Sequence, residues 1–157
     1  MPKLSTEKQA SEEKLEMEFS SVTVAFLVHS TEDYEKLMKL VIEKLGIHED
    51  EFMTEKMHGY FGNQIESVKG HVIGQRAQIV ASTIFSHLSK NSRIQLLSEL
   101  EKSIDEHDSL YLRVDRQLLE DNEIFLSEEE PIRVKIKPKK RFGGHAFMKR
   151  EYEDLIE

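Results

Sequence analysis

Residues 52–75 read FMTEKMHGYFGNQIESVKGHVIGQ, and this pattern is typical of a β-hairpin. The dipeptide Gly62-Asn63 suits a two-residue type II′ turn, whose twist matches that of paired strands. Such a turn places Phe61 opposite Gln64 and predicts the register of the whole hairpin.

Counting outward from that turn defines two hairpin faces, because side chains alternate along a strand. The predicted pairs on one face are Tyr60 with Ile65, His58 with Ser67 and Lys56 with Lys69. An aromatic ring, an imidazole and two lysines together favour a binding surface. The other face is predicted to meet the core through Met53, Met57, Phe61, Val68 and Val72.

The rest of the chain predicts further strands and helices. Residues 19–30 are rich in β-branched side chains and predict a central strand, and strict alternation predicts strands at 110–114 and 132–137. Helical spacing of apolar residues predicts helices over 31–45, after Gly74, and from Ser92 onward. Residues 124–126 predict a brief strand. This order indicates an α+β fold, a largely antiparallel sheet with helices packed on one face.

A chain of 157 residues is most simply one domain. Residues 1–17 are predicted to be a flexible acidic arm, 18–138 a single α+β RNA-binding-like domain, and 139–157 a basic and aromatic tail with a short helix. The apolar positions of that helix fit either docking on the domain or binding a partner.

Composition limits the function classes. The chain has no cysteine, which excludes disulfides, thiolate catalysis and cysteine-ligated metal sites. It has no apolar run of membrane-spanning length, and its start is too acidic for a signal peptide, so we expect a cytoplasmic protein without membrane contact.

No catalytic or cofactor signature occurs in the sequence, so we expect no enzyme activity, no cofactor and no metal. A loop metal site at His48, Asp50 and Glu51 lacks a fourth ligand, and a hydrated acidic loop explains these residues better. An acid-base pair of His58 and His71 for RNA cleavage is disfavoured because the hairpin separates the two side chains.

The charge of the chain is strongly asymmetric. The net charge is -8, yet residues 132–150 contain eight lysines and arginines and no acidic residue. This segment therefore carries +8 and the remainder -16. The asymmetry indicates a basic contact strip on an acidic body, which suits a polyanionic partner.

Candidate RNA-binding residues follow from these patterns. A solvated sheet edge is the plain alternative for the basic strand, and a cap and turn is the plain alternative for Asp115-Arg116-Gln117. The predicted RNA-binding residues are Lys56, His58, Tyr60, Lys69, Arg113, Arg116, Gln117, Arg133, Lys135, Lys137, Lys139, Lys140 and Arg141. Tyr60 would stack on a base, and the cations would neutralise phosphates.

The segments HGYFGNQI, LYLRVDRQ and IRVKIK resemble a known family. From about Val22 to Lys137 the chain is similar to the archaeal family of predicted exosome-associated RNA-binding subunits, whose fold is similar to that of ribosomal large-subunit protein L-five. The resemblance implies RNA binding and offers no catalytic residues. The matching positions are His58, Gly59, Gly62, Asn63, Arg113, Asp115 and Gln117.

Two positions depart from the family pattern. Gln64 stands where the family has proline, and Arg116 stands where it has lysine, so turn and charge are both preserved. The resulting hypothesis is a non-catalytic RNA-binding protein with protein partners in an RNA-processing complex such as the exosome. The alternative is a protein-interaction module whose basic strip meets an acidic partner, and a ribonuclease is a remote third.

Overall fold

A computed structural model describes residues 17–139 and 143–157. The predicted acidic arm lies outside the described residues except for Met17. Eleven elements follow one another along the described chain: β1 (Phe19–His29), α2 (Tyr34–Leu45), η1 (Glu49–Glu51), β2 (Phe52–His58), β3 (Gln64–Ile73), α3 (Gly74–His87), α4 (Lys90–Ser98), α5 (Leu100–Ser103), β4 (Leu110–Val114), β5 (Ile132–Pro138) and α6 (Gly144–Ile156). No helix in this part of the chain has the length and apolar character to cross a bilayer.

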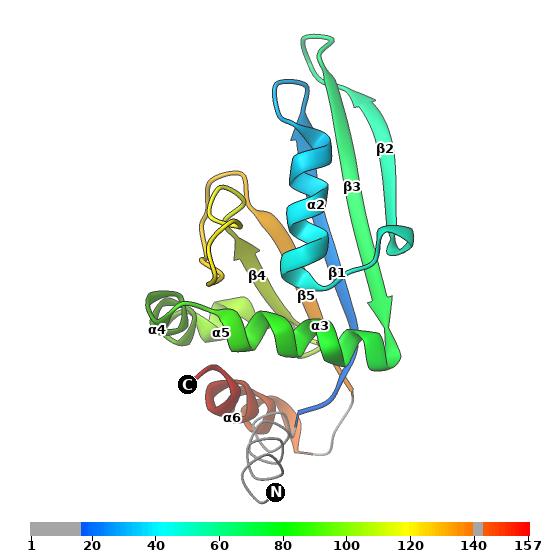
Figure 1. Ribbon diagram of the computed structural model, residues 1–157. Helices are drawn as coiled ribbons and strands as arrows, with labels where there is room; N and C mark the ends of the chain where they lie inside the picture. The colour runs from blue at the N-terminus through cyan, green and yellow to red at the C-terminus, as the bar shows by residue number, and fades with distance from the viewer. Residues whose placement is uncertain (1–16, 140–142) are drawn as a thin grey trace, which may run out of the picture.

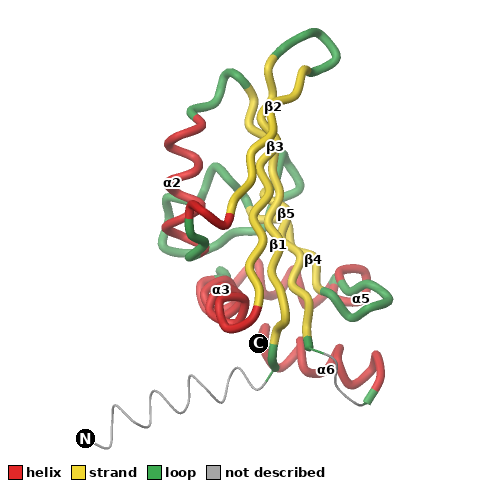
Figure 2. The backbone as a smooth tube through the Cα atoms, turned by 90° about the vertical axis from the view of Figure 1, so that its right-hand side faces the viewer, coloured by secondary structure: helices red, strands yellow, loops and turns green. Residues whose placement is uncertain are grey.

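The strands form one antiparallel five-stranded sheet in the order β2-β3-β1-β5-β4. Helices α2 and α3 lie on one face of it, α5 lies beside the lower end of the other face, and α6 crosses beneath that end (Figure 1 and Figure 2). The α+β fold with a largely antiparallel sheet is therefore confirmed. We call the face opposite α2 and α3 the open face.

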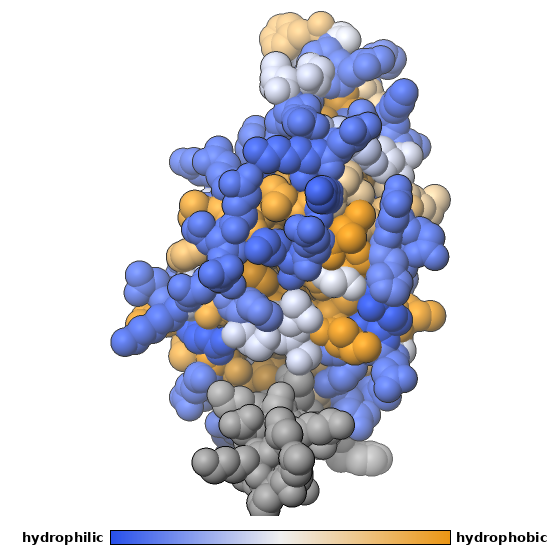
Figure 3. All heavy atoms as spheres, viewed as in Figure 1, coloured by the Kyte–Doolittle hydropathy of each residue, from blue (hydrophilic) through white to orange (hydrophobic). Residues whose placement is uncertain are grey.

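Alternation in the central strand β1 builds the core. From Val22 onward its even-numbered side chains are buried beneath the helices, namely Val22, Val24, Phe26 and Val28. The predicted stripe of α3 is buried as expected, including Val80, Ile84 and Phe85. The outer surface of this helix-covered side is mostly hydrophilic, with hydrophobic residues exposed again at the hairpin tip (Figure 3).

Helix α2 begins later than the sequence predicts. Its N-cap is Asp33, whose side chain accepts a hydrogen bond from the Lys36 backbone N–H at 3.2 Å. A carboxylate at this position satisfies a free donor and favours the positive end of the helix. The helix ends at Gly46, which adopts the left-handed conformation with φ 75° as the sequence indicates.

The third predicted helix differs in its start and its continuity. It begins at Lys90 and not Ser92, because Ser89 is the N-cap and accepts from the Ser92 backbone N–H at 3.1 Å. The chain then divides at Glu99 into α4 and the short α5. The predicted strand at 124–126 is present only as isolated bridges from Ile124 and Leu126.

Helix α6 docks on the lower end of the domain and buries Met148, Tyr152 and Ile156. The Tyr152 hydroxyl donates to the Asp108 carbonyl at 2.6 Å. His145 lies between two carboxylates, with Nδ1 2.9 Å from Asp108 Oδ1 and Nε2 3.2 Å from Glu101 Oε1. The hydrogen bond with Asp108, followed in size by the one with Glu101, raises the pKa of His145. The structure thus shows the terminal helix docked on its own domain.

Candidate nucleic-acid interface

The open face carries a group of exposed cations from three strands. In β5 and β4 the buried and exposed residues alternate strictly, so that apolar side chains enter the core and the intervening side chains point outward. In β3 the buried residues are even-numbered, which turns its odd-numbered side chains to the same outer face. The five exposed cations on this face are Lys69, Arg113, Arg133, Lys135 and Lys137.

The register aligns three of these cations across the sheet. Lys69 pairs with Ala25, Ala25 pairs with Arg133, and Arg133 pairs with Arg113. Neighbouring strands lie about 4.8 Å apart, so Lys69 and Arg133 are separated by roughly 10 Å with only a small side chain between them. We call Lys69, Arg133 and Arg113 the basic row.

A second row runs beside the basic row and contains an aromatic ring. Lys135 pairs with Tyr111 on one side and with Thr23 on the other, and Thr23 pairs with His71. The Lys135 ammonium lies 5.7 Å from the centre of the Tyr111 ring. Tyr111 is 44% exposed, which leaves part of its ring accessible for stacking.

Asp105 holds Tyr111 in place. Its Oδ2 accepts from the Tyr111 hydroxyl at 2.9 Å, while Oδ1 accepts from the backbone N–H groups of His107 and Ser109, each at 2.9 Å. Burial opposes ionisation of Asp105, but these hydrogen bonds outweigh it and lower its pKa. The ionised carboxylate of Asp105 thus orients the ring of Tyr111 through this hydrogen bond.

Acidic side chains of the described residues also lie on or near this face, and Glu55 of β2, which pairs with Ser67, is exposed on it between Met53 and Met57. Glu128 Oε1 lies 3.7 Å from Arg113 Nη1, and both side chains are highly exposed. Just beyond the end of β5, Lys139 pairs with Glu18 at 3.2 Å. Exposed pairs of this kind contribute little to stability. Lys140 and Arg141, two further predicted RNA-binding residues, lie outside the described residues.

The predicted register of the hairpin is wrong by three residues. His58 pairs with Gln64 and Lys56 with Glu66, so residues 59–63 form the loop and the predicted two-residue turn is absent from it. An odd shift moves every side chain of one strand to the opposite face. Lys56 and His58 consequently lie on the helix-covered side, away from Lys69 on the open face.

The register error also overturns part of the predicted core. Met53 and Met57 point to the open face, where they are 79% and 46% exposed, and Phe61 in the loop is 91% exposed. Strand β2 is at the edge of the sheet, and no helix of the described residues covers the side of β2 that carries Met53 and Met57. The two other predicted core residues of the hairpin, Val68 and Val72, are buried.

The hairpin loop stands clear of the body at the top of the molecule (Figure 1). Tyr60 is 97% exposed, and its ring packs edge-to-face against Phe61 with centroids 5.1 Å apart. Hydrogen bonds from Gly59 N to Asn63 O at 2.7 Å and from Gly62 N to Gly59 O at 2.9 Å close the loop. Gly62 has φ 78°, a conformation that favours glycine.

Arg116, one of the predicted RNA-binding residues, is largely buried and hydrogen-bonded within the chain. It is 9% exposed, and Nη1 donates to the Leu27 carbonyl at 2.7 Å and to both Glu32 carboxylate oxygens at 3.1 Å. Nε donates to the Glu130 carbonyl at 2.6 Å. These bonds join β1 to the segment before β5, a role that no spacing in the sequence indicates.

The neighbouring Asp115 and Gln117 form a local turn. Asp115 Oδ1 accepts from the backbone N–H groups of Gln117 at 2.8 Å and Leu118 at 3.2 Å. The carboxylate therefore caps the turn, which matches the plain alternative for this motif. Gln117 is exposed in a cleft that also contains Lys36 and Glu120.

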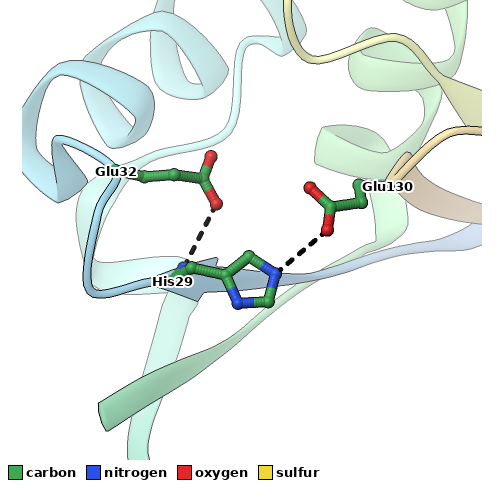
Figure 4. A group of neighbouring side chains, drawn as sticks. All are labelled: His29, Glu32 and Glu130. Carbon is green, nitrogen blue, oxygen red and sulfur yellow. Dashed lines mark hydrogen bonds and ion pairs between the residues drawn. The ribbon is translucent and has the colours of Figure 1, made fainter. Parts of the chain in front are cut away.

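One group of side chains in the described residues has ligand atoms close enough for a metal ion. Atoms of His29, Glu32 and Glu130 lie within 4.8 Å of one another, and Figure 4 shows His29 between the two glutamates. The Arg116 guanidinium already neutralises Glu32 at 3.1 Å. His29 Nε2 lies 3.3 Å from Glu130 Oε1, so contacts within the chain account for the arrangement.

The acidic loop of His48, Asp50 and Glu51 is also held by an ion pair. Arg76 hydrogen-bonds Glu51 and lowers the pKa of that carboxyl. His58 and His71, the disfavoured acid-base pair, lie on opposite faces of the sheet.

Tyr111 and His71 belong to the open face, yet the candidate residues from sequence omitted them. The signal for Tyr111 was present, because it alternates outward in the same strand as Arg113. His71 shares the outer side of β3 with Lys69, and its Nδ1 lies 2.9 Å from Thr23 Oγ1.

Together the fold and the site define an α+β domain with a basic, partly aromatic open sheet face. A family model described as RNA binding matches residues 21–138, and the chain belongs to this RNA-binding family. A relative named RNA-binding protein PAB1135, from Pyrococcus abyssi, is 31% identical over 125 residues, which span 76% of this chain and 81% of the relative.

Solved structures share the fold. Protein AF2318 from Archaeglobus fulgidus, a member of the family DUF54, has a TM-score of 0.72 at 25% identity and covers 88% of this chain and 99% of its own. Protein SSO0741 from Sulfolobus solfataricus, also of DUF54, has a TM-score of 0.71 at 21% identity, over 87% of this chain and 96% of its own. A UPF0201 protein from Methanococcus jannaschii has a TM-score of 0.57 at 15% identity, over 85% of this chain and 92% of its own.

Proposed function

We propose that this protein binds single-stranded RNA on the open face of its sheet, without catalysing a reaction. The observation that carries the proposal is the basic row, in which Lys69, Arg133 and Arg113 stand on three of four neighbouring strands, on a face that α2 and α3 leave free. Lys135 and Lys137 extend the positive charge along β5. The membership in an RNA-binding family supports RNA as the polyanion.

The pairing of Arg113 with Arg133 supports a charged ligand. Like charges directly opposite each other on neighbouring strands destabilise a sheet. An RNA strand lying across the two guanidinium groups would relieve that repulsion, and binding of its phosphates would release counterions. The arrangement therefore suits a polyanion better than bare solvent.

Exposed rings at both ends of the face suit unpaired bases. Tyr111 lies beside the basic row, and Tyr60 stands in the hairpin loop. Stacking of bases on aromatic rings of an open sheet is a common mode of single-stranded RNA recognition. Lys139, at the end of β5, and the neighbouring Lys140 and Arg141 would add further phosphate contacts.

Three finer statements stay predictions from the resemblance and the composition. These are association with the exosome through protein partners, likeness of the fold to ribosomal protein L-five, and a cytoplasmic location. Affinity purification of the full chain, with and without ribonuclease, tests the first. Exosome subunits retained after ribonuclease treatment would support a direct protein contact, whereas their loss would indicate that RNA bridges the two.

Salt dependence of RNA binding tests the proposed function. Engagement of about five phosphates of single-stranded RNA gives a slope near -3.5 in a plot of log affinity against log salt. Lys69→Gln in the basic row should make that slope shallower by about 0.7, since one phosphate contact is lost. Lys39→Gln on the outer surface of α2 removes the same charge away from the open face and should leave the slope unchanged.

Two results of the salt titration would contradict RNA binding on the open face. Measurable binding with a flat salt response, or no RNA retained at low salt, would refute the proposal. Retention of an acidic protein in place of RNA would favour the alternative protein-interaction module.

A further inference from the structure

A cleft opens beside the basic row where the sheet divides. Pairing of β1 with β5 ends at Ala25 and Arg133, whereas pairing of β1 with β3 continues to His29. Pro131 lacks the N–H that would extend the ladder, and Glu130 has a positive φ of 41° that turns the chain away. The far end of β1 is therefore left without a strand on its β5 side.

The space left by this division has a volume of about 460 Å³, within the range of small-ligand sites. Apolar groups of Ala25, Leu27 and Pro131 form part of its wall. Arg133 and Ser67 line it from the open face, so a polymer held by the basic row passes its mouth. We call this space the β1–β5 cleft.

The charges around the β1–β5 cleft disfavour a phosphate group inside it. The inner guanidinium of Arg116 is already matched by Glu32 at 3.1 Å, and the Glu130 carboxylate adds a further negative charge at the wall. A neutral, planar group that carries both donors and acceptors suits such a wall better. Nucleobases have this character, and unpaired bases in RNA are bound through their edges in this way.

We propose that the β1–β5 cleft binds one guanine base of the RNA strand held by the basic row. This inference rests on the RNA binding proposed above. Guanine presents adjacent acceptors, O6 and N7, which suit the fork of the Arg133 guanidinium. Its N1–H and amino donors suit the Glu130 carboxylate, whose Oε1 is oriented by His29 at 3.3 Å. Leu27 and Pro131 supply apolar contact for the ring.

Two short single-stranded oligonucleotides test the inference, one of uridines alone and one with a single central guanosine. Fluorescence anisotropy at fixed salt gives the affinity of the full chain for each. We expect the guanosine oligonucleotide to bind about tenfold more tightly, as for a well-formed pair of base-edge contacts. Adenosine at the same position should give a smaller gain.

Glu130→Gln and Glu129→Gln form a matched pair of variants. Both remove one negative charge near the basic face, but only Glu130 lines the β1–β5 cleft, while Glu129 lines the cleft of Gln117. We expect Glu130→Gln to abolish most of the guanosine preference and Glu129→Gln to keep it. Ser67→Phe, which fills the cleft from the open face, should also abolish the preference without changing the salt slope.

Each contrary outcome is distinct. Salt-dependent binding of both oligonucleotides with equal affinity would overturn the guanine site and leave the proposed RNA binding intact. A preference that survives both Glu130→Gln and Ser67→Phe, or one lost equally in Glu129→Gln, would place base recognition elsewhere and overturn it too. Failure of the wild-type chain to bind either oligonucleotide at low salt would overturn both proposals.

Discussion

The two ends of the open face differ in chemistry and in support. Around β5 and β4 the face is cationic, and its residues stand on strands whose inner side chains are fully packed in the core. Toward β2 it carries the exposed Met53 and Met57 on either side of Glu55, on an edge strand that leads to the loop of Tyr60. The basic end would therefore offer phosphates a surface backed by the core, whereas the hairpin end would offer rings and thioethers from a projecting arm.

This difference suggests that the two ends would make different contacts with a nucleic-acid ligand, one with phosphates and the other with bases. Phosphate contacts hold a strand in place without regard to sequence, while base contacts add selectivity. The β1–β5 cleft lies between the two ends, where β1 loses β5 as a neighbour. Changes at the basic end should therefore alter salt dependence, and changes at the hairpin end should alter affinity alone.

The largest expected effect concerns Arg116, which holds the segment before β5 against β1. Arg116→Met removes the cation from Glu32 and the donor from the carbonyls of Leu27 and Glu130. Breaking a buried pair in this way should lower the free energy of unfolding by about 3 kcal/mol. Urea denaturation measures the loss.

Arg113→Met is the matched control, because the Arg113 side chain is 61% exposed and pairs only loosely with Glu128. Its effect on unfolding should stay within about 0.5 kcal/mol. Equal effects of the two variants would show that Arg116 does not join the strands as its contacts indicate.

Tyr60→Ala separates the hairpin end from the basic end. If a base stacks on this ring, affinity for single-stranded RNA should fall by about 1–3 kcal/mol. The salt slope should not change, because no charge is removed. Titrations at several salt concentrations measure both quantities.

Lys56→Gln is the control within the hairpin, since Lys56 lies on the helix-covered side. We expect it to change neither affinity nor slope. A shallower slope for Tyr60→Ala, or an unchanged affinity, would contradict the proposed division between the two ends.

The smallest expected effect is a pH dependence at α6, beneath the basic end. Hydrogen bonds with Asp108 and Glu101 raise the pKa of His145 above its ordinary value, so the protonated imidazole stabilises the folded state. This contribution is complete below the ordinary histidine pKa and is lost as pH rises through the raised value. Because the His145 side chain is 46% exposed, solvent screening keeps it below about 1 kcal/mol.

Unfolding measured on both sides of neutral pH, in wild type and His145→Gln, isolates the effect. The wild type should lose more stability than the variant between mildly acidic and mildly basic pH. His107→Gln serves as the control, because the exposed His107 has its Nε2 3.5 Å from the exposed carboxylate of Glu106. A wild type and a His145→Gln variant with parallel pH profiles would contradict the ion pairs of His145.

Much of the fold and of the basic end was predictable from local pattern. Strict alternation in residues 132–137 and 110–114 assigned Arg133, Lys135 and Arg113 to the outer side, because buried and exposed positions in a strand have a period of two. Tyr111 could have been included on the same basis. The stripe of α3 likewise followed from helical spacing.

The hairpin register was not predictable in this way. Gly62 was correctly recognised as a turn glycine, but residues 59–63 form a loop closed by backbone hydrogen bonds. Because the loop has three more residues than the predicted turn, each side chain of β2 lies on the face opposite to the predicted one. Since β2 is at the edge of the sheet, Met53 and Met57 are exposed there.

The sequence by itself determined which strands are two-faced, where helices α2 and α3 bury their stripes, and that positive charge gathers near the end of the chain. Only the tertiary structure decided that Lys69 joins Arg133 and Arg113 in one row, that Arg116 is buried, and that a cleft opens at the end of the β1–β5 ladder. Local periodicity reports the two faces of a single element. The partners of a strand and the point at which pairing ends depend on contacts between residues far apart in the chain, which no local pattern contains.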